Sequence, residues 1–166
     1  MCGITGILGR GDPEERRRRV ARMTRALTHR GPDDEGFFDD DQVSLGFRRL
    51  AVIDLETGEQ PIVDGERSLA LVLNGEIYNF RELRRDLRAR GHRFRSTCDS
   101  EVVVHAYEDW GDACVDRFRG IFAFGVWDGA RRRLFLARDR LGVKPLYYWA
   151  ANSQFAFASQ PRALLA

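Results

Sequence analysis

The sequence predicts an α+β protein built from packed layers, with β-sheets stacked face to face. The chain has 166 residues, of which 43% are hydrophobic. A chain of this size and composition fits a single domain, residues 1–166, that buries roughly two thirds of its unfolded surface. Many short strand-like segments surround about two long amphipathic helices, and such a mixture packs best as layers of helix and sheet.

The first elements are a buried strand and a helix. The apolar run at residues 4–8 predicts the strand. The helix opens with Asp12 as the capping residue, Pro13 at the first position and Glu15 at the third. Its core face consists of three residues at helical spacing, Val20, Met23 and Leu27. We expect it to end at residues 29–32.

The rest of the chain alternates short apolar runs with two more helices. One helix places Phe80, Leu83 and Leu87 on one face and ends at Gly91, and the next begins near Asp99. Strands are expected at residues 36–38, 43–48, 51–54, 68–73, 121–127, 134–137, 146–149 and 155–158, with a hairpin turn at 128–129. Residues 161–166 resemble the start of a helix, so we expect the chain to be a piece of a longer protein.

Charge and composition exclude several classes of function. The 27 basic residues are balanced by 25 acidic ones, for a net charge of +2, which gives no reason to expect nucleic-acid binding. The arginines at residues 16–19 follow acidic residues on the same predicted helix and are interpreted as a solvated face. Three cysteines and three histidines are dispersed along the chain, so neither a disulfide framework nor a metal site is predicted.

The sequence also suggests a compartment. Its start lacks the charged and apolar regions of a secretion signal. No apolar run reaches the roughly 18 residues of a membrane span. We expect a cytoplasmic protein, where a thiol stays reduced.

Cys2 is the main candidate for chemistry. Removal of Met1 would leave a nucleophilic thiol and a free α-amine on one residue. An α-amine has a pKa of roughly 7.7–8.0 and a thiol one of about 8.5, so the amine can take the thiol proton near neutral pH. The simpler alternative is an initiator methionine followed by an ordinary free cysteine.

Five motifs, in order over nearly the whole chain, give a specific resemblance. They are CGITGI at residues 2–7, HRGPDDEG at 29–36, NGEIYN at 74–79, GIFAF at 120–124 and RDRLGVKPLYY at 138–148. Together they resemble the class II, or N-terminal nucleophile, glutamine amidotransferases, and in particular the glutaminase domain of glutamine-hydrolysing asparagine synthetases. The resemblance implies a four-layer αββα sandwich.

The resemblance also implies the groups that stabilise a tetrahedral oxyanion. Asn74 would donate through its side-chain amide and Gly75 through its backbone N–H. Loss of one such donor typically costs about 3–4 kcal/mol of transition-state stabilisation. Taken alone, Asn-Gly is a strong signal for a two-residue hairpin turn.

Further residues would hold the charged end of glutamine. By resemblance, Arg49 binds the α-carboxylate, Asp99 pairs with the α-ammonium, and Glu76 lies beside the oxyanion donors. The segment Leu50, Ala51, Val52 and Ile53 would line the substrate with backbone groups. The alternatives are a helix N-cap for Asp99 and ordinary surface for Arg49.

Other residues have weaker assignments. A rival scheme uses His29 or His105 as the base for a cysteine, although His29 is better interpreted as ordering the corner after the first helix. The roles of Arg138, Asp139 and Lys144 stay open.

The sequence departs from the family pattern in three places. Phe47 stands where many asparagine synthetases have histidine, which could reshape the pocket wall, and Gln160–Pro161 replaces an acidic residue and an aliphatic one. The ATP-binding synthetase domain is not in this sequence. We therefore expect no cofactor for the glutaminase half, with ATP and Mg²⁺ needed only by that other domain.

Two hypotheses remain at this stage. The first is a glutaminase that forms a γ-glutamyl thioester on Cys2 and passes ammonia to a C-terminal or separate synthetase domain; a homodimer is also possible. The second is a catalytically idle amidotransferase-like module used for assembly or glutamine sensing. The joint presence of Cys2, Arg49, Asn74, Gly75 and Asp99 favours the first. The final ammonia acceptor is not fixed by the sequence.

Overall fold

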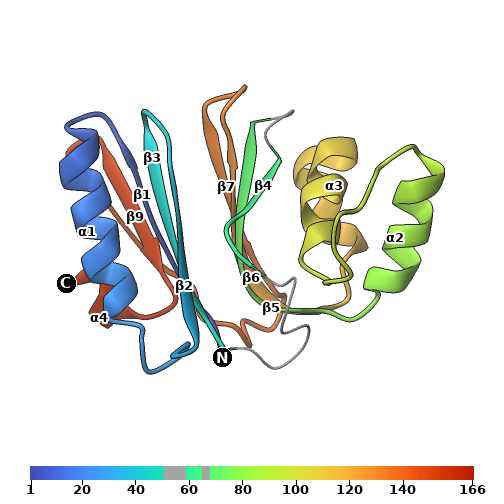
Figure 1. Ribbon diagram of the computed structural model, residues 1–166, viewed down its shortest axis with the longest axis horizontal. Helices are drawn as coiled ribbons and strands as arrows, with labels where there is room; N and C mark the ends of the chain where they lie inside the picture. Colours follow the sequence, from blue (N-terminus) through green and yellow to red (C-terminus); the bar gives the residue numbers. More distant parts are fainter. Residues whose placement is uncertain (51–58, 65–67) are drawn as a thin grey trace.

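The computed structural model describes residues 1–50, 59–64 and 68–166 as four stacked layers (Figure 1). Helices α1 (Pro13–Arg25) and α4 (Pro161–Leu164) cover the outer face of one sheet. Helices α2 (Phe80–Ala89) and α3 (Glu101–Trp110) cover the outer face of the other. The inner faces of the two sheets pack against each other, which confirms the predicted αββα sandwich.

Both sheets are antiparallel among the described residues. The first has the order β2-β3-β1-β9-β8, with β2 (Asp34–Asp39), β3 (Val43–Arg49), β1 (Gly3–Gly9), β9 (Gln154–Ala158) and β8 (Tyr147–Ala151). The second has the order β4-β5-β6-β7, with β4 (Ile62–Asp64), β5 (Leu69–Ile77), β6 (Gly120–Asp128) and β7 (Arg133–Arg138). A 3₁₀ helix, η1 (Gly111–Arg117), links α3 to β6.

Strand β5 explains how one sequence serves two cores. Successive side chains of a strand point to opposite faces of its sheet. Leu71 and Leu73 accordingly belong to the core beneath α2 and α3, whereas Ala70 and Val72 belong to the core between the sheets. A third cluster, which includes Val20, packs α1 and α4 on the first sheet. Each layer boundary is therefore an apolar seam.

Most of the predicted elements are present, with informative changes in extent. The side chain of Asp12 caps α1 by accepting from the Glu14 N–H at 3.0 Å, as predicted. The strand expected at 68–73 runs on to Ile77. The turn expected at 128–129 is a longer connection between β6 and β7, residues 129–132. The strand expected at 51–54 lies outside the described residues.

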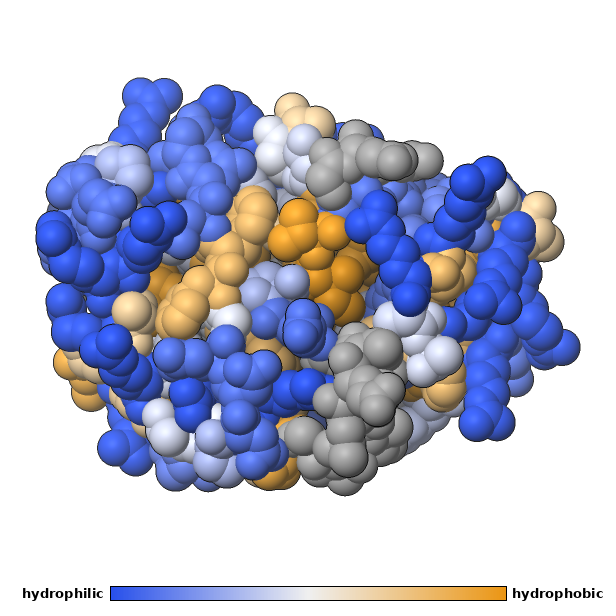
Figure 2. All heavy atoms as spheres, in the orientation of Figure 1, coloured by the Kyte–Doolittle hydropathy of each residue, from blue (hydrophilic) through white to orange (hydrophobic). Residues whose placement is uncertain are grey.

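The surface follows the same layering. In Figure 2, hydrophilic residues cover the two helical flanks, and hydrophobic residues reach the surface near the middle of this face. Among the helices of the described residues, none has the length and apolar character needed to cross a bilayer.

Candidate active site

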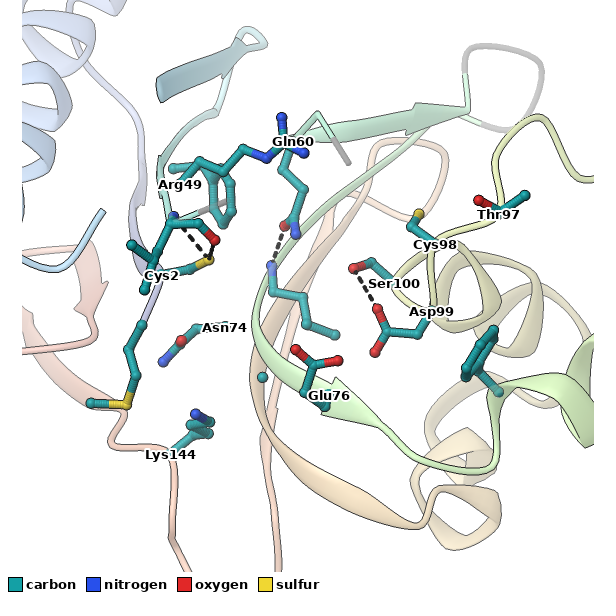
Figure 3. A pocket seen from close by; sticks show the side chains of 16 residues that line it. Cys2, Arg49, Gln60, Asn74, Glu76, Thr97, Cys98, Asp99, Ser100 and Lys144 are labelled. Carbon is teal, nitrogen blue, oxygen red and sulfur yellow. Dashed lines mark hydrogen bonds between the residues drawn. The ribbon is translucent and has the colours of Figure 1, made fainter. Parts of the chain in front are cut away.

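One cavity brings together the sequence-predicted site residues that the structure describes. It has a volume of about 350 Å³, within the range of roughly 300–1,000 Å³ typical of small-molecule sites. Its lining includes Cys2, Arg49, Leu50, Asn74, Gly75, Glu76 and Asp99. Cys2 lies directly before β1, Arg49 at the end of β3, Asn74 and Glu76 in the second half of β5, and Asp99 shortly before α3 (Figure 3). Both sheets therefore contribute to the cavity.

Cys2 lies directly before β1 and is held in place at its backbone. The Arg30 Nε donates to the Cys2 carbonyl at 2.9 Å. The Cys2 Sγ faces Leu50, whose backbone N–H donates to the sulfur at 3.5 Å, while the Leu50 carbonyl lies 3.9 Å from it. The thiol is therefore both fixed and open to the cavity.

Asn74 and Gly75 lie inside strand β5, opposite Ala123 and Phe122 of β6. The hairpin-turn interpretation of this pair is therefore wrong. The Asn74 side chain is buried, and its Nδ2 finds no hydrogen-bond partner among the described residues. Leaving a buried donor without a partner costs about 1–3 kcal/mol of folding stability, and a functional role would explain why this cost is tolerated. Its place on the cavity wall makes it a donor available to a ligand.

Gly75 cannot be replaced without moving backbone. Its φ is +147°, and a Cβ at this position would come 2.1 Å from the Ile121 carbonyl oxygen of the neighbouring strand. Real Cβ atoms do not approach so closely, so glycine is required where β5 borders the cavity.

The opposite end of the cavity carries two carboxylates that face each other, from Glu76 and Asp99 (Figure 3). Burial, together with the neighbouring charge of Asp99, raises the pKa of Glu76, although Lys144 opposes this. Burial also raises the pKa of Asp99, although the backbone N–H of Ile77 opposes this by donating to its Oδ2 at 2.7 Å. Two such carboxylates favour a bound cation, because a positive charge offsets both the desolvation of the carboxylates and the repulsion between them.

The bond from Ile77 also decides the role of Asp99. Helix α3 begins at Glu101, with Ser100 at the cap position. The Asp99 carboxylate instead ties the approach to α3 to the end of β5. Asp99 is therefore not the N-cap of the helix.

Two adjacent arginines have different positions. Arg48 donates to the Gly31 carbonyl at 2.7 Å and pairs with Glu35 at 2.9 Å, so it holds the corner after α1. Arg49 is only 9% exposed and lines the cavity, which rules out ordinary surface. Leu50 lies beside it, whereas Ala51, Val52 and Ile53 lie outside the described residues.

Comparison with known proteins agrees with this geometry. The family model for the glutamine amidotransferase domain matches residues 1–166. The chain belongs to this family. It is 46% identical over 169 residues to asparagine synthetase [glutamine-hydrolyzing] 3 of Bacillus subtilis, and 39% identical over 166 residues to asparagine synthetase [glutamine-hydrolyzing] 3 of Arabidopsis thaliana. The alignments cover 100% and 99% of this chain but only 28% of each relative.

Solved structures support the same fold. The glutamine phosphoribosylpyrophosphate amidotransferase of B. subtilis, complexed with ADP and GMP, superposes with a TM-score of 0.80 at 21% identity. The match covers 98% of this chain and 43% of that one. The domain thus has the same fold as that amidotransferase.

The structure adds cavity residues that sequence patterns did not assign. Gln60 lines the cavity and accepts from the Leu73 N–H at 2.6 Å. Lys144 lines it as well, at the end of a loop gathered around buried Asp139, whose carboxylate accepts from the N–H groups of Val143 and Lys144 at 2.9 and 3.0 Å. The RDRLGVKP motif was a signal for this loop, but not for the direction of its lysine. Phe47 does form part of the pocket wall.

The rival histidine scheme finds no support. His29 is exposed, and the corner it was expected to order is held by Arg30 and Arg48. His105 lies on α3, with its Nδ1 3.0 Å from Glu108. Neither histidine lines the cavity that contains Cys2.

Proposed function

We propose that this amidotransferase domain hydrolyses L-glutamine to glutamate and ammonia through a thioester on Cys2. The observation that carries the proposal is the content of one cavity: a held thiol, a buried unpaired amide donor and a pair of carboxylates. These groups match a carboxamide at one end of a ligand and an ammonium at the other.

The first half of the reaction makes the thioester. Once Met1 is removed, the α-amine of Cys2 takes the thiol proton, and the thiolate attacks the side-chain carbonyl carbon of glutamine. The oxyanion is stabilised by the Asn74 Nδ2–H and the Gly75 N–H. Collapse of this intermediate expels ammonia, which leaves with the proton held by the α-amine. The product is a γ-glutamyl thioester on Cys2.

The second half releases glutamate. A water molecule gives one proton to the α-amine and attacks the thioester carbonyl. The same two donors stabilise the second oxyanion. Its collapse breaks the C–S bond, and the proton returns to the sulfur. No electrons are gained or lost in either step, and glutamine hydrolysis by this route needs no metal or cofactor.

Recognition of the amino-acid end fixes the amide against the sulfur. In the proposal, Asp99 and Glu76 hold the α-ammonium, and the planar guanidinium of Arg49 holds the α-carboxylate. Leu50 and, by resemblance, Ala51, Val52 and Ile53 line the substrate. Placement of a reactant in this manner removes much of the entropic part of the barrier.

The relatives support a proposal for the fate of the ammonia. The curated relatives that are named glutamine-hydrolysing asparagine synthetases are more than three times as long as the matched part. We propose that the ammonia passes to an ATP- and Mg²⁺-dependent amidation domain, C-terminal or separate, in the cytoplasm, and that the protein forms a homodimer. The glutaminase unit itself spans residues 1–166.

The test is ammonia release from glutamine by protein whose Met1 has been removed, as verified by intact mass. We expect one glutamate per ammonia, and loss of both in Cys2→Ala. Cys98→Ser is the matched control, because Cys98 is the other thiol on the cavity wall, and it should retain activity. Glutamine binding without ammonia release would contradict the proposal and favour an idle sensing module.

A further inference from the structure

A second cluster of reactive side chains lies outside the glutamine cavity, on the outer helical layer. His92 follows α2, whereas His105 and Glu108 lie on α3. The spacing of three residues places His105 and Glu108 on one face of the helix. A ligand atom from each of the three residues lies within 4.8 Å of the other two. All three side chains are at least nine-tenths buried.

The two imidazoles have the same arrangement around one carboxylate. The Nδ1 atoms of His92 and His105 both lie 3.0 Å from the same Oε2 of Glu108. The far nitrogens face other carboxylates: His92 Nε2 is 2.8 Å from Asp109, and His105 Nε2 is 3.7 Å from Glu101. Metal-binding histidines almost always present one nitrogen to the ion and direct the other at a carboxylate or carbonyl.

This arrangement is poorly satisfied by two neutral histidines alone. A neutral imidazole carries a single N–H, yet three of the four ring nitrogens lie within 3.0 Å of a carboxylate oxygen, and the fourth, the buried His105 Nε2, has no hydrogen-bond partner among the described residues. At least one lone pair then points at negative charge unless a ring is protonated. A cation between the two Nδ1 atoms and Glu108 also removes the conflict, and it leaves the His92 Nε2–H to donate to Asp109.

We propose that His92, His105 and Glu108 bind one divalent zinc ion. Two imidazoles and one carboxylate are a donor set that zinc accepts in tetrahedral geometry, with water at the fourth position. A hollow of about 780 Å³ adjoins the cluster, lined by α3 and β4 residues together with His92. It offers a route for the ion and space for the water.

The site joins the glutamine cavity through the segment between His92 and α3. Glu101 accepts from the N–H groups of Arg95 and Ser96 at 2.7 and 2.9 Å, which folds this segment onto the helix. Cys98 lines both hollows, and Asp99 follows it. The ion would therefore stabilise the segment that presents Asp99, as a structural ion that does not depend on glutamine hydrolysis.

The test measures metal binding by the full chain carrying Cys2→Ala, which removes a competing thiol chelate. After removal of metals with a chelator, calorimetric titration with Zn²⁺ should give one ion per chain. His92→Asn and His105→Asn should abolish this binding, and Asp109→Asn should weaken it roughly tenfold to hundredfold. His29→Asn is the matched control, since His29 is exposed and outside the cluster, and it should bind as before.

X-ray absorption of the zinc-loaded protein that retains all three ligands tests the site even if a histidine variant fails to fold. Only nitrogen and oxygen neighbours, including two imidazoles at about 2.0–2.1 Å, support the site. A sulfur neighbour at about 2.3 Å would overturn it. It would also be overturned by no binding, or by equal binding in the folded His92→Asn, His105→Asn and His29→Asn proteins, which would leave a hydrogen-bonded network only.

Discussion

The two ends of the glutamine cavity are built on different physical principles. At the thiol end, Cys2 and Asn74 are positioned by backbone and strand pairing, and the unpaired polar atom is a neutral donor. At the other end, Glu76 and Asp99 are charged, partly buried and mutually repulsive, with raised pKa values. The thiol end stabilises the negative charge that develops on the oxyanion in the transition state. The carboxylate end binds the α-ammonium, a positive charge that the substrate already carries.

This difference separates reaction from recognition. A group that binds only the transition state lowers kcat when it is removed. A group that binds substrate and transition state equally raises KM. Variants at the two ends should therefore affect different kinetic constants.

The largest expected effect is at Asn74. Asn74→Ala should lower kcat by about 10²–10³-fold, because one oxyanion donor is lost, while KM changes little. Steady-state ammonia release measures both constants. A large rise in KM at unchanged kcat would place Asn74 in substrate binding and break the comparison.

Gly75→Ala should damage the same end through its backbone. The positive φ and the contact with the Ile121 carbonyl oxygen predict a loss of at least about 1–3 kcal/mol in the free energy of unfolding. Denaturant unfolding measures this loss. Gly91→Ala is the matched control, since a Cβ there meets nothing within 4 Å although φ is +101°. Equal losses in the two variants would show that crowding beside β6 is unimportant.

At the recognition end, Asp99→Asn should raise KM by about tenfold to a hundredfold, with kcat nearly unchanged. Charge-assisted hydrogen bonds contribute about 1.5–3 kcal/mol, and asparagine can still accept from the Ile77 N–H. Asp116→Asn is the control, because that acid is 76% exposed and lies outside this cavity. A fall in kcat at constant KM would contradict the assigned role.

The smallest expected effect is on pH dependence. Because burial raises the pKa values of Glu76 and Asp99, both carboxylates lose their negative charge at a higher pH than ordinary carboxylates do when the solution is acidified. KM should therefore rise on the acidic side, and less steeply in Asp99→Asn. A KM that is flat with pH in the unmodified protein would argue against ammonium binding by these acids.

The sequence predicted the layers and much of the site because both depend on local patterns. Apolar periodicity located β1 and α1, and the five motifs contain Cys2, Asn74 and Glu76 of the cavity, whereas Arg49 and Asp99 were assigned by resemblance. Asn74–Gly75 looks like a turn because its local preference is strong, yet pairing of β5 with β6 overrides that preference. Tertiary contacts decide the structure of such segments, and the periodicity of a single segment carries no information about those contacts.

The same limit explains what the sequence left unassigned. Gln60 is held in the cavity by Leu73, 13 residues further along the chain, and Lys144 lies at the end of a loop that folds around Asp139, five residues before it. His92 and His105 are too far apart for a short metal motif, and only the packing of the connection after α2 against α3 brings them together. For Gln60 and for the two histidines, the decisive contact joins segments that the sequence separates.

The central claim is that Cys2, of the three cysteines, is the nucleophile. Cys98 lines the same cavity, and Cys114 is buried, which raises its pKa to about 12. The most direct measurement is peptide mass spectrometry after incubation of Met1-free protein with a glutamine-mimicking diazoketone. We predict one adduct per chain, on Cys2, that excess glutamine prevents. An adduct on Cys98, or none on Cys2 in folded protein, would contradict the account.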